Sequence, residues 1–525
     1  MKNIFLKTLK LLGVVMLTIV FIFMAGILWP LDVPQPKVKP ERLIIQNAMI
    51  VDVESGVLRQ GEDIFIQGGQ IISVGDGSAA EMHDLAAAFA NAQIVDAAGQ
   101  FAIPGMFDMH THAFKMAPYL THPLYVAAGV TAVRDMGGCL GADDAWFACS
   151  DDKRVWNERV NAGQLVAPRF DQVTGLAING GNAIPDGFDI SLGGGTAEGA
   201  RARASFDKAR GIDFLKTYSE LPREGYFALA EEAPNQGMYL AGHLPFAVTA
   251  IEGIEAGQRS FEHAFFFIWG CYPGMLKLRQ TGDIYSAFTN EARSRMIAEH
   301  DATVCEDLRA RMVRSGATYV PTHTTRKLDA YALDSAFRSD PRLKYIPAPL
   351  RMMWLEDADN MARRAGEGGE KSYKAIYEFG LKQTGLAHKA GVVVLAGTDA
   401  PDSFVFPGLG MQDELDHFIR AGLSPLEALQ TATLAPAQFL GLEGVAGIIA
   451  AGARADIVLL RANPIEDINA VEQIETVILA GTVYDRKELD GMLQTVEGNA
   501  NSWTMWPKFA WQIVRSPLML KQFAD

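Results

Sequence analysis

The sequence has few cysteines and no excess of basic residues, and each observation excludes some classes of protein function. Only four cysteines occur in 525 residues, and none has the close paired spacing of a structural zinc site or a CxxC redox motif. A Cys139–Cys149 bridge would fit an oxidising compartment, but the spacing favours isolated, packed thiols. Lysine and arginine number 47 against 62 acidic residues, and the formal charge of −15 argues against a nucleic-acid partner.

A phosphate-binding loop is also missing. The glycine-rich stretch GGGTAEGARARA, residues 193–204, lacks the GxxxxGK(S/T) pattern and the strand context of a nucleotide-binding fingerprint. We expect it to form a flexible lid over an active-site mouth.

With 49% apolar side chains, the chain can bury the cores of one large domain and one smaller domain.

One long uncharged run lies at the amino terminus. Residues 11–29, LLGVVMLTIVFIFMAGILW, follow Lys2, Lys7 and Lys10, and at ~1.5 Å per residue they nearly span a bilayer core of ~30 Å. A cleaved signal peptide is the alternative, but the run is long for one and no small-x-small cleavage site follows it. We therefore expect a single-pass transmembrane anchor in residues 1–30 and a proline-rich, extended linker in residues 31–42.

The residues flanking this anchor predict its orientation only weakly. Lys37, Lys39 and Arg42 nearly balance the three lysines before the helix, so the positive-inside rule has little force. We expect a cytosolic amino terminus and a catalytic domain on the periplasmic or extracellular side.

The C-terminal tail, residues 488–525, is a second candidate for membrane contact. It mixes tryptophans and cations in a way that suits a bilayer interface: Trp503, Trp506, Lys508, Trp511, Arg515 and Lys521. Packing on the protein body or on a second copy of the chain would explain the same residues, so a homo-oligomer is compatible with the sequence.

The rest of the chain divides into three regions. Short β-rich runs in residues 43–104 and 436–487 predict one small β-sandwich domain built from both ends of the chain. Between them, residues 105–435 alternate apolar strands with helical patterns, which is typical of parallel βα units. The number of units favours a closed (β/α)8 TIM barrel, so the predicted class is α/β, with chemistry at the carboxyl ends of the strands.

The segment GMFDMHTHAF, residues 105–114, places two histidines two residues apart. In a strand, residues i and i+2 share a face, so Asp108, His110 and His112 point the same way at the end of the first barrel strand. Two imidazoles so placed can hold one metal ion, although an HxH pair alone is equally explained as a surface accident. The polar residues that follow along the chain favour the metal site.

Lys216 lies inside the apolar strand IDFLKTY, where burial lowers the pKa of its ammonium group. A neutral lysine amine can take up carbon dioxide to form a carbamate, a carboxylate able to bridge two metal ions. A lysine that extends past the strand end, or pairs with an acid, is the alternative. His243, His263 and Asp399 each close another apolar strand, which would place them at the same barrel rim.

With these residues, the sequence resembles the binuclear amidohydrolases over residues 43–487. The stretches PGMFDMHTH, AAGVTAVRDMGG, GLSPLEALQTATLAPAQFLG and GARADIVLLRANPIEDI add to the resemblance. It implies two divalent ions, zinc by preference, with manganese, iron or cobalt fitting the same ligands. It also implies how they are held: N6-carboxylated Lys216 bridges one ion bound by His110, His112 and Asp399 and a second bound by His243 and His263.

Within that superfamily, LKTYSELPREGYFALAEEA, AGHLP and FEH are similar to the prolidase-like, imidazolonepropionase-related branch. Deaminases of the superfamily usually have HxxE after the fifth strand and no bridging lysine, so HLPF and Lys216 disfavour a deaminase. The resemblance implies a hydrolase of small amide or dipeptide-like substrates, acting through metal-activated hydroxide with Asp399 as general base. Lactone or phosphoester hydrolysis at the same site, and a noncatalytic binding protein, are the competing interpretations.

Three further polar residues have weaker signals. Tyr218 shares a strand face with Lys216, so its hydroxyl is a candidate donor to the developing oxyanion, with core packing as the alternative. Arg134 and Asp135 are expected to form a structural ion pair beneath the site. His323, at the end of the seventh strand, would either touch substrate or lie in a loop without a role.

Overall fold

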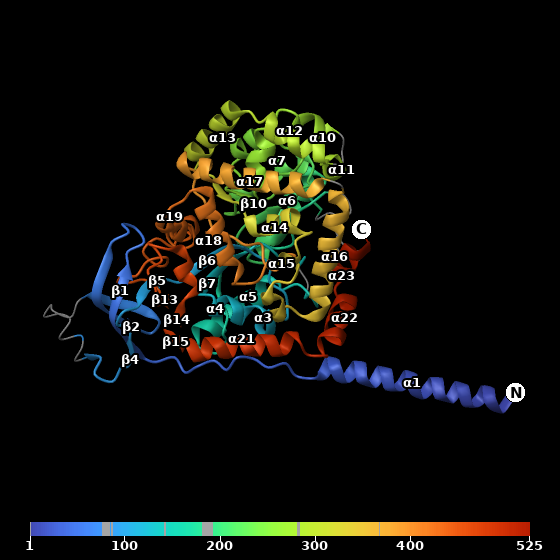
Figure 1. Ribbon diagram of the computed structural model, residues 1–525, viewed down its shortest axis with the longest axis horizontal. Helices are drawn as coiled ribbons and strands as arrows, with labels where there is room; N and C mark the ends of the chain where they lie inside the picture. The colour runs from blue at the N-terminus through green and yellow to red at the C-terminus, as the bar shows by residue number, and fades with distance from the viewer. Residues whose placement is uncertain are drawn as a thin grey trace.

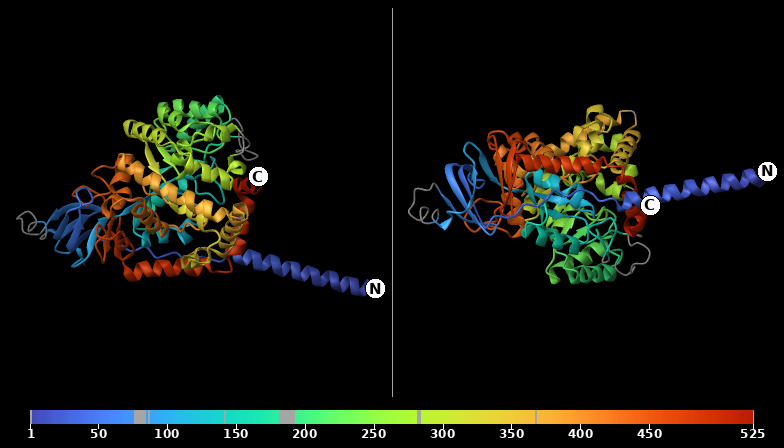
Figure 2. Two further views of the ribbon diagram at one scale, coloured as in Figure 1. Left: turned by 45° about the horizontal axis from the view of Figure 1, so that its top comes forward. Right: turned by 90° about the horizontal axis from the view of Figure 1, so that it is seen from below.

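The computed structural model describes residues 2–75, 85, 88–140, 143–180, 193–280, 284–366 and 368–524. It is an α/β fold with mixed sheets, and a single long helix, α1, projects from one end (Figure 1). Figure 2 shows from two other directions that α1 and the sheet containing β1 lie at opposite ends of the molecule. The strands are β1 (Arg42–Val51), β2 (Leu58–Gln67), β3 (Gln70–Gly75), β4 (Gln93–Asp96), β5 (Phe101–Pro104), β6 (Met106–Thr111), β7 (Val130–Asp135), β8 (Arg169–Val173), β9 (Leu215–Thr217), β10 (Leu240–Gly242), β11 (Ser260–Glu262), β12 (Thr318–Val320), β13 (Ile457–Leu460), β14 (Ile474–Leu479) and β15 (Thr482–Asp485).

Helices connect most of these strands. They are α1 (Lys2–Leu28), α3 (Ala117–Leu120), α4 (His122–Ala127), α5 (Ser150–Asn161), α6 (Ala197–Ala209), α7 (Arg223–Asn235), α8 (Ala250–Glu255), α9 (Phe265–Gly270), α10 (Met275–Gln280), α11 (Ile284–Ala287), α12 (Asn290–Ala298), α13 (Ala302–Ser315), α14 (His323–Tyr331), α15 (Ser335–Arg338), α16 (Ala348–Ala365), α17 (Gly369–Lys389), α18 (Gly410–Ala421), α19 (Pro425–Thr431), α20 (Leu434–Leu440), α21 (Arg486–Ala500), α22 (Met505–Arg515) and α23 (Pro517–Ala524), with 3-10 turns η2 (Pro341–Tyr345) and η3 (Ile468–Glu472).

Strands from both ends of the chain share one eight-stranded sheet. β5 pairs with both β1 and β13, so the N-terminal strands β1–β5 and the C-terminal strands β13–β15 form one hydrogen-bonded unit. The sheet forks at β1, whose first half pairs with β4 and whose second half pairs with β5. Ile45 and Ile64 pack with Ile457 and Ile478 in its core, which joins the two ends of the chain by apolar burial.

Two parallel sheets form the central region. β6, β7 and β8 make the first, and β9, β10, β11 and β12 make the second. Isolated parallel bridges join Thr217 of β9 to Ile178, which follows β8, and join Tyr319 of β12 and Thr111 of β6 to Val394 and Ala400 in one further segment. The carboxyl ends of these strands therefore lie at one common edge, where α/β proteins place their ligands.

All four cysteines are paired, so the expectation of isolated thiols is wrong. Cys139 bonds Cys149, and Cys271 bonds Cys305. The second pair is 34 residues apart and joins the end of α9 to α13, so the fold brings together two thiols that the sequence spacing does not connect. Disulfides are typical of proteins that fold in an oxidising compartment.

Residues 193–204 do not form the flexible lid that their glycines suggested. From Ala197 onward they are the first turns of α6, whose N-cap Thr196 accepts a hydrogen bond from the Gly199 amide at 3.1 Å. Arg203 is buried and pairs with Asp207 at 2.8 Å, one helical turn later. The helix is amphipathic and packs against α7, which the glycine content concealed.

A buried histidine outside the central site predicts acid sensitivity. His122, at the start of α4, is 1% exposed, its ring lies 4.5 Å from that of Trp156, and neither ring nitrogen has a hydrogen-bond partner among the described residues. Burial lowers the pKa of His122 to about 3. Because the unfolded chain takes up this proton near pH 6.5, the stabilisation from a neutral His122 is complete above pH 6.5 and is lost as the pH falls toward 3.

We therefore expect His122→Phe to reduce the acid sensitivity of the full chain. Between pH 6.5 and 4.5 the wild-type protein should lose about 2–3 kcal/mol more unfolding free energy than the variant. Thermal or denaturant melts of both proteins at several pH values measure this difference. Parallel stability curves for the two proteins would show that His122 does not contribute.

Candidate metal centre

The six side chains predicted to hold metal come together at the common edge of the two parallel sheets. His110 lies in β6, and His112 follows that strand directly. Lys216 is the middle residue of β9. His243 and His263 follow β10 and β11, and Asp399 lies in the segment that pairs with the end of β6 through the amide of Asp399 and the carbonyl of His110.

The distances show how tightly these groups cluster. Lys216 Nζ lies 3.4 Å from Nε2 of both His110 and His112. Asp399 Oδ1 lies 3.3 Å from His110 Nε2 and 2.9 Å from His112 Nε2, and Asp399 Oδ2 lies 3.6 Å from His263 Nδ1. Ligand atoms of His110, His263 and Asp399 all lie within 4.8 Å of one another, close enough to share one ion.

The outer nitrogens of three imidazoles are fixed by hydrogen bonds. Nδ1 lies 2.9 Å from Glu262 Oε2 in His110, 2.7 Å from Ser219 Oγ in His243, and 2.8 Å from Thr322 Oγ1 in His263. When each Nδ1–H donates to its oxygen, the lone pair of Nε2 faces the cluster. The sequence analysis did not identify Glu262, Ser219 or Thr322, although Glu262 directly precedes the predicted ligand His263 in the FEH stretch.

The donor set fits divalent cations. His243 Nε2 and His263 Nε2 lie 2.9 Å apart, so in the tautomer in which both Nδ1 atoms carry the proton, two lone pairs face each other and a cation beside both would stabilise them. Four imidazoles and one carboxylate are the nitrogen and oxygen ligands that zinc and related first-row metals accept. The residues therefore suit metal ions, with Lys216 beside His110 and His112.

Burial makes the protonated and charged forms of these groups costly. It lowers the pKa of Lys216 and of all four histidines, and it lowers that of His112 to about 3. Burial also raises the pKa of Asp399 to about 6. Neutral imidazoles are the form that binds metal, and an unprotonated lysine amine is the form that reacts with carbon dioxide.

The backbone at the cluster is strained in three places. His263 has φ 72°, Asp399 has φ 69° and Thr322 has φ 45°, all in the left-handed region that residues other than glycine seldom adopt. Such strain costs about 1–3 kcal/mol per residue and is concentrated at functional sites. Two of the three are predicted ligands, and the third holds His263.

A buried ion-pair network supports the cluster from below, with partners that differ from those expected. Arg134 pairs with Glu262 at 2.8 Å rather than with Asp135, and its Nε also donates to the carbonyl of Met109. Asp135 pairs instead with Lys153 at 2.7 Å. Adjacent residues of a strand point to opposite faces, which prevents Arg134 and Asp135 from meeting. Arg134 therefore orients Glu262, and Glu262 orients His110.

Glu262→Gln is expected to weaken metal binding about 10–100-fold, the effect typical of losing the outer partner of a metal-binding histidine. An amide cannot balance the buried Arg134 guanidinium, so a loss of about 3–5 kcal/mol in stability should accompany it. Competition with a chelator gives the affinity, and denaturant melts give the stability.

The exposed pair Arg201–Glu231 offers a matched control for this change. Glu231→Gln removes the same charge from an ion pair at the surface and should alter neither quantity measurably. Unchanged metal affinity in Glu262→Gln would contradict the positioning role.

The remaining predicted residues have mixed outcomes. Tyr218 is 38% exposed and its ring lies 4.2 Å from that of His243, so it borders the cluster rather than the core. Asp108 does not face the metal ligands, because its carboxylate accepts from Thr398 N–H at 2.9 Å and from Thr398 Oγ1 at 2.5 Å. His323 is fully buried at the start of α14 and contacts Thr384 Oγ1 at 2.8 Å, so neither substrate contact nor a loop position describes it.

Comparison with solved structures places this fold among known hydrolases. A bottromycin amidohydrolase superposes with a TM-score of 0.66 at 20% identity, over 89% of this chain and 92% of that one. A Xaa-Pro dipeptidase with bound methionine gives a TM-score of 0.56 at 20% identity, over 85% of this chain and all of that one. At these identities the likeness concerns the fold.

The sequence also matches curated proteins. Adenine deaminase 3 of Rhizobium meliloti (strain 1021) is 24% identical over 437 residues, which are 82% of this chain and 56% of that protein. Adenine deaminase 2 of Agrobacterium fabrum (strain C58 / ATCC 33970) is 24% identical over 434 residues, or 81% and 54%. The chain thus spans about half the length of these relatives. Because residues 220–484, about half of the chain, match the amidohydrolase family itself, the protein belongs to that family.

Proposed function

We propose that this protein is a metal-dependent hydrolase that cleaves amide or dipeptide-like C–N bonds of small molecules. The observation that carries the proposal is the convergence of four imidazoles, Lys216 and Asp399 within contact distance at one edge of the parallel sheets. When bound, two divalent ions would supply a water that loses its proton near neutral pH and a Lewis acid for the carbonyl oxygen.

In this proposal each ligand has a defined role. His110 and His112 would hold one ion with Asp399, and His243 and His263 would hold the other. Lys216, once carboxylated on Nζ by carbon dioxide with release of one proton, would supply a carboxylate ligand to the ions. Zinc suits this set best, and manganese, iron or cobalt would also be accepted.

In this proposal Asp399 transfers the proton, and Tyr218 stabilises the negative charge that develops on the carbonyl oxygen. Asp399 accepts a proton from the attacking water and returns it to the leaving nitrogen, because its carboxylate lies among the ligands and burial has already raised its pKa to about 6. The hydroxyl of Tyr218, whose ring lies against that of His243, donates to the oxygen that becomes negative as the carbonyl is attacked.

A second candidate function is deamination, which the names of the curated relatives support. The presence of Lys216 between the imidazoles favours a prolidase-like reaction instead, since it supplies a bridging carboxylate. Lactone and phosphoester hydrolysis need the same attacking water.

A substrate panel tests the proposal. Full-length protein loaded with zinc or manganese should hydrolyse Xaa-Pro dipeptides or N-acyl amino acids faster than adenine, lactones or phosphotriesters. Release of ammonia from adenine alone would establish the deaminase, and activity only on lactones or phosphotriesters would overturn C–N hydrolysis.

The architecture around the site is part of the proposal. We propose that the two parallel sheets and residues 393–400 form one closed (β/α)8 barrel spanning residues 105–435, supported by the three parallel bridges between them. Residues 43–104 and 436–487 would form the second domain, and residues 488–525 an appended tail.

Membrane attachment rests on α1. Within the described residues, one helix segment, Phe5–Leu28, is long and apolar enough to cross a membrane, a property that signal sequences share. We propose that it is an uncleaved single-pass anchor with the catalytic domain on the periplasmic or extracellular side, in keeping with the paired cysteines.

A further inference from the structure

The tail helix α22 has two apolar faces and only one of them is buried. Met505 and Phe509 pack in a cluster with Phe114 and Met116, which follow β6. On the opposite side Trp506, Ala510 and Val514 recur at helical spacing and are exposed. Trp503 is 53% exposed and Trp511 38%, so two further exposed indoles lie near this stripe. A soluble protein rarely exposes so many large apolar side chains together.

The buried face of α22 contacts the loops that carry the site. Phe114 is two residues beyond His112, and its ring stacks on Trp146, which in turn meets Phe509 edge-on at 5.1 Å. Two residues span at most ~7 Å, the two ring contacts are 6.0 and 5.1 Å between centroids, and a helix with its side chains is about 10–12 Å across, so the exposed stripe lies at most on the order of 30 Å from His112. Ser516 adds a hydrogen bond to Asp144 at 3.0 Å, in the loop after β7.

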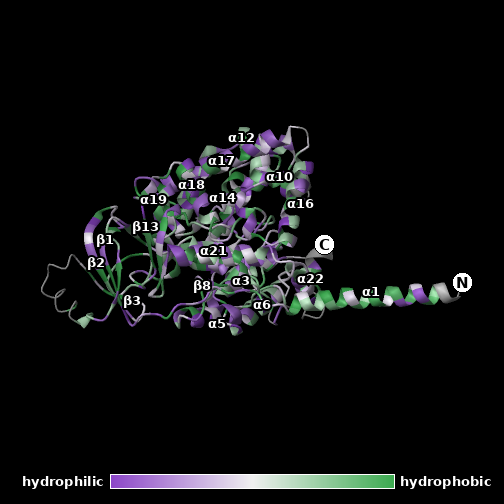
Figure 3. Cartoon of the chain, turned by 60° about the horizontal axis from the view of Figure 1, so that its bottom comes forward, coloured by the Kyte–Doolittle hydropathy of each residue, from purple (hydrophilic) through white to green (hydrophobic). Residues whose placement is uncertain are grey.

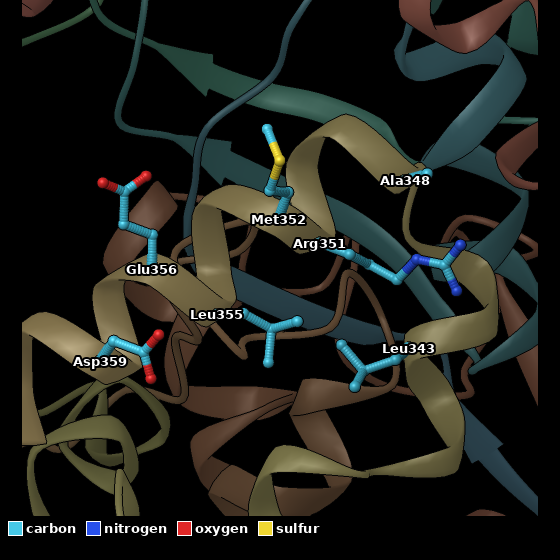
Figure 4. Close-up of a pocket in the computed structure, with 7 residues that line it drawn as sticks. All are labelled: Leu343, Ala348, Arg351, Met352, Leu355, Glu356 and Asp359. Carbon is cyan, nitrogen blue, oxygen red and sulfur yellow. The ribbon is translucent and has the colours of Figure 1, made fainter.

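Helix α16 packs beside α22. Its buried Trp354 contacts Phe404 and Phe406, which follow Asp399 in the chain. Its outer face exposes Met352 and Leu355, but the open groove of about 590 Å³ that they line also carries Arg351, Glu356 and Asp359, so this face is charged (Figure 4). Arg351 donates to Asn501 at 3.2 Å and thereby ties α16 to the beginning of the tail.

Helix α22 lies at the base of α1. Lys508 of α22 donates to the carbonyl of Ile27 at 2.7 Å, and Gly26 faces Trp503 and Pro507 so closely that a side chain there would collide with them. Asn499 donates both to Asp32, just beyond α1, and to Tyr119, just beyond His112. Figure 3 shows α1 as largely apolar, with α22 beside its base. The exposed stripe therefore belongs to the helix that contacts the base of α1.

We infer that the outer face of α22 is a lipid-docking surface built onto the rim of the site, and that it adapts the enzyme to amides bearing a hydrocarbon chain. The occupant is the bilayer surface, because α1 would deliver the bilayer to this face. Indoles at the headgroup level, with Lys508 and Arg515 beside them, are what an interfacial helix presents. The substrate class rests on the proposed amide hydrolysis, whereas the docking surface does not.

Spin-label depth measurements test the docking surface without any assay of activity. All four native cysteines are paired, so Val514→Cys and Val57→Cys each give the full chain one labelling site. The two valines are matched, 59% and 56% exposed, and Val57 precedes β2 at the end of the molecule opposite α1 (Figure 1). In phosphatidylcholine nanodiscs the label at 514 should collide about tenfold more with oxygen, relative to a water-soluble nickel chelate, than the label at 57. Equal accessibility at both positions would overturn the docking surface.

Kinetics in the same nanodiscs test the substrate class. The ratio of kcat/KM for dodecanoyl over acetyl amino acids should be about tenfold or more, and it should fall in Trp506→Gln but not in Val57→Asn. An unchanged ratio in Trp506→Gln, or no preference for the long chain, would overturn the substrate class. Failure to hydrolyse either amide would instead refute the proposed function, and the depth measurement would still decide the docking surface.

Discussion

Lys216→Ala is expected to lower kcat/KM for amide substrates by roughly 10³-fold or more and to leave at most one metal ion per chain. Nζ of Lys216 lies 3.4 Å from two imidazoles that belong to one predicted ion, and the strand bearing it is paired with β10, which leads to His243. Without Lys216 there is no carbamate, whose negative charge would offset the repulsion between the two cations. Losses of activity of this size are typical when a preorganised charge is removed from a catalytic site. Metal analysis and steady-state kinetics measure the two effects.

The same variant offers a direct test of carboxylation. Alanine leaves a space where the carbamate would lie, so acetate or propionate should restore part of the activity and of the second metal ion. Lys389→Ala removes an exposed lysine of α17 and should change neither quantity. A Lys216→Ala protein that keeps two ions and full activity would contradict a bridging role.

Much of this site was accessible from the sequence because its signals are local. Period-two alternation places Asp108, His110 and His112 in one strand, and an apolar run before each of the other polar residues predicts that they lie at strand ends. These signals depend on a few neighbouring residues, and strands aligned in parallel bring their ends together without further information.

The features that sequence reasoning missed depend on contacts between distant segments. In the sequence, Glu262 is a single acidic residue in an apolar stretch. The fold places it between Arg134, 128 residues away in the sequence, and His110, 152 residues away. The Cys271–Cys305 bond depends on the packing of α9 and α13, and the helix at Ala197 depends on its burial against α7. Glycine content is a local signal that this packing overrides.

Asp108 shows that a residue can be placed correctly from the sequence while its role is not. The alternation correctly places it in β6 with His110, but its carboxylate bonds Thr398 and joins β6 to the segment bearing Asp399. Burial raises the pKa of Asp108 to about 7, which marks a structural carboxyl group as readily as a catalytic one. Only the identity of its partner separates the two roles.

Asp399→Asn is expected to reduce kcat by about 10²–10⁴-fold, the range typical of losing a general base, while most of the bound metal remains. Asparagine is a clean replacement here, because it has the same shape and tolerates the left-handed φ of 69° better than other side chains do. The amide oxygen can still face a cation, but it cannot accept the proton of the attacking water.

Asp402→Asn provides the control. Asp402 is a second carboxyl group on the same loop, and burial raises its pKa to about 7, but its replacement should affect kcat far less. Together, kcat and metal content separate the interpretations: a large drop in kcat with metal retained assigns the proton transfer to Asp399, and unchanged activity in Asp399→Asn would favour a noncatalytic binding protein.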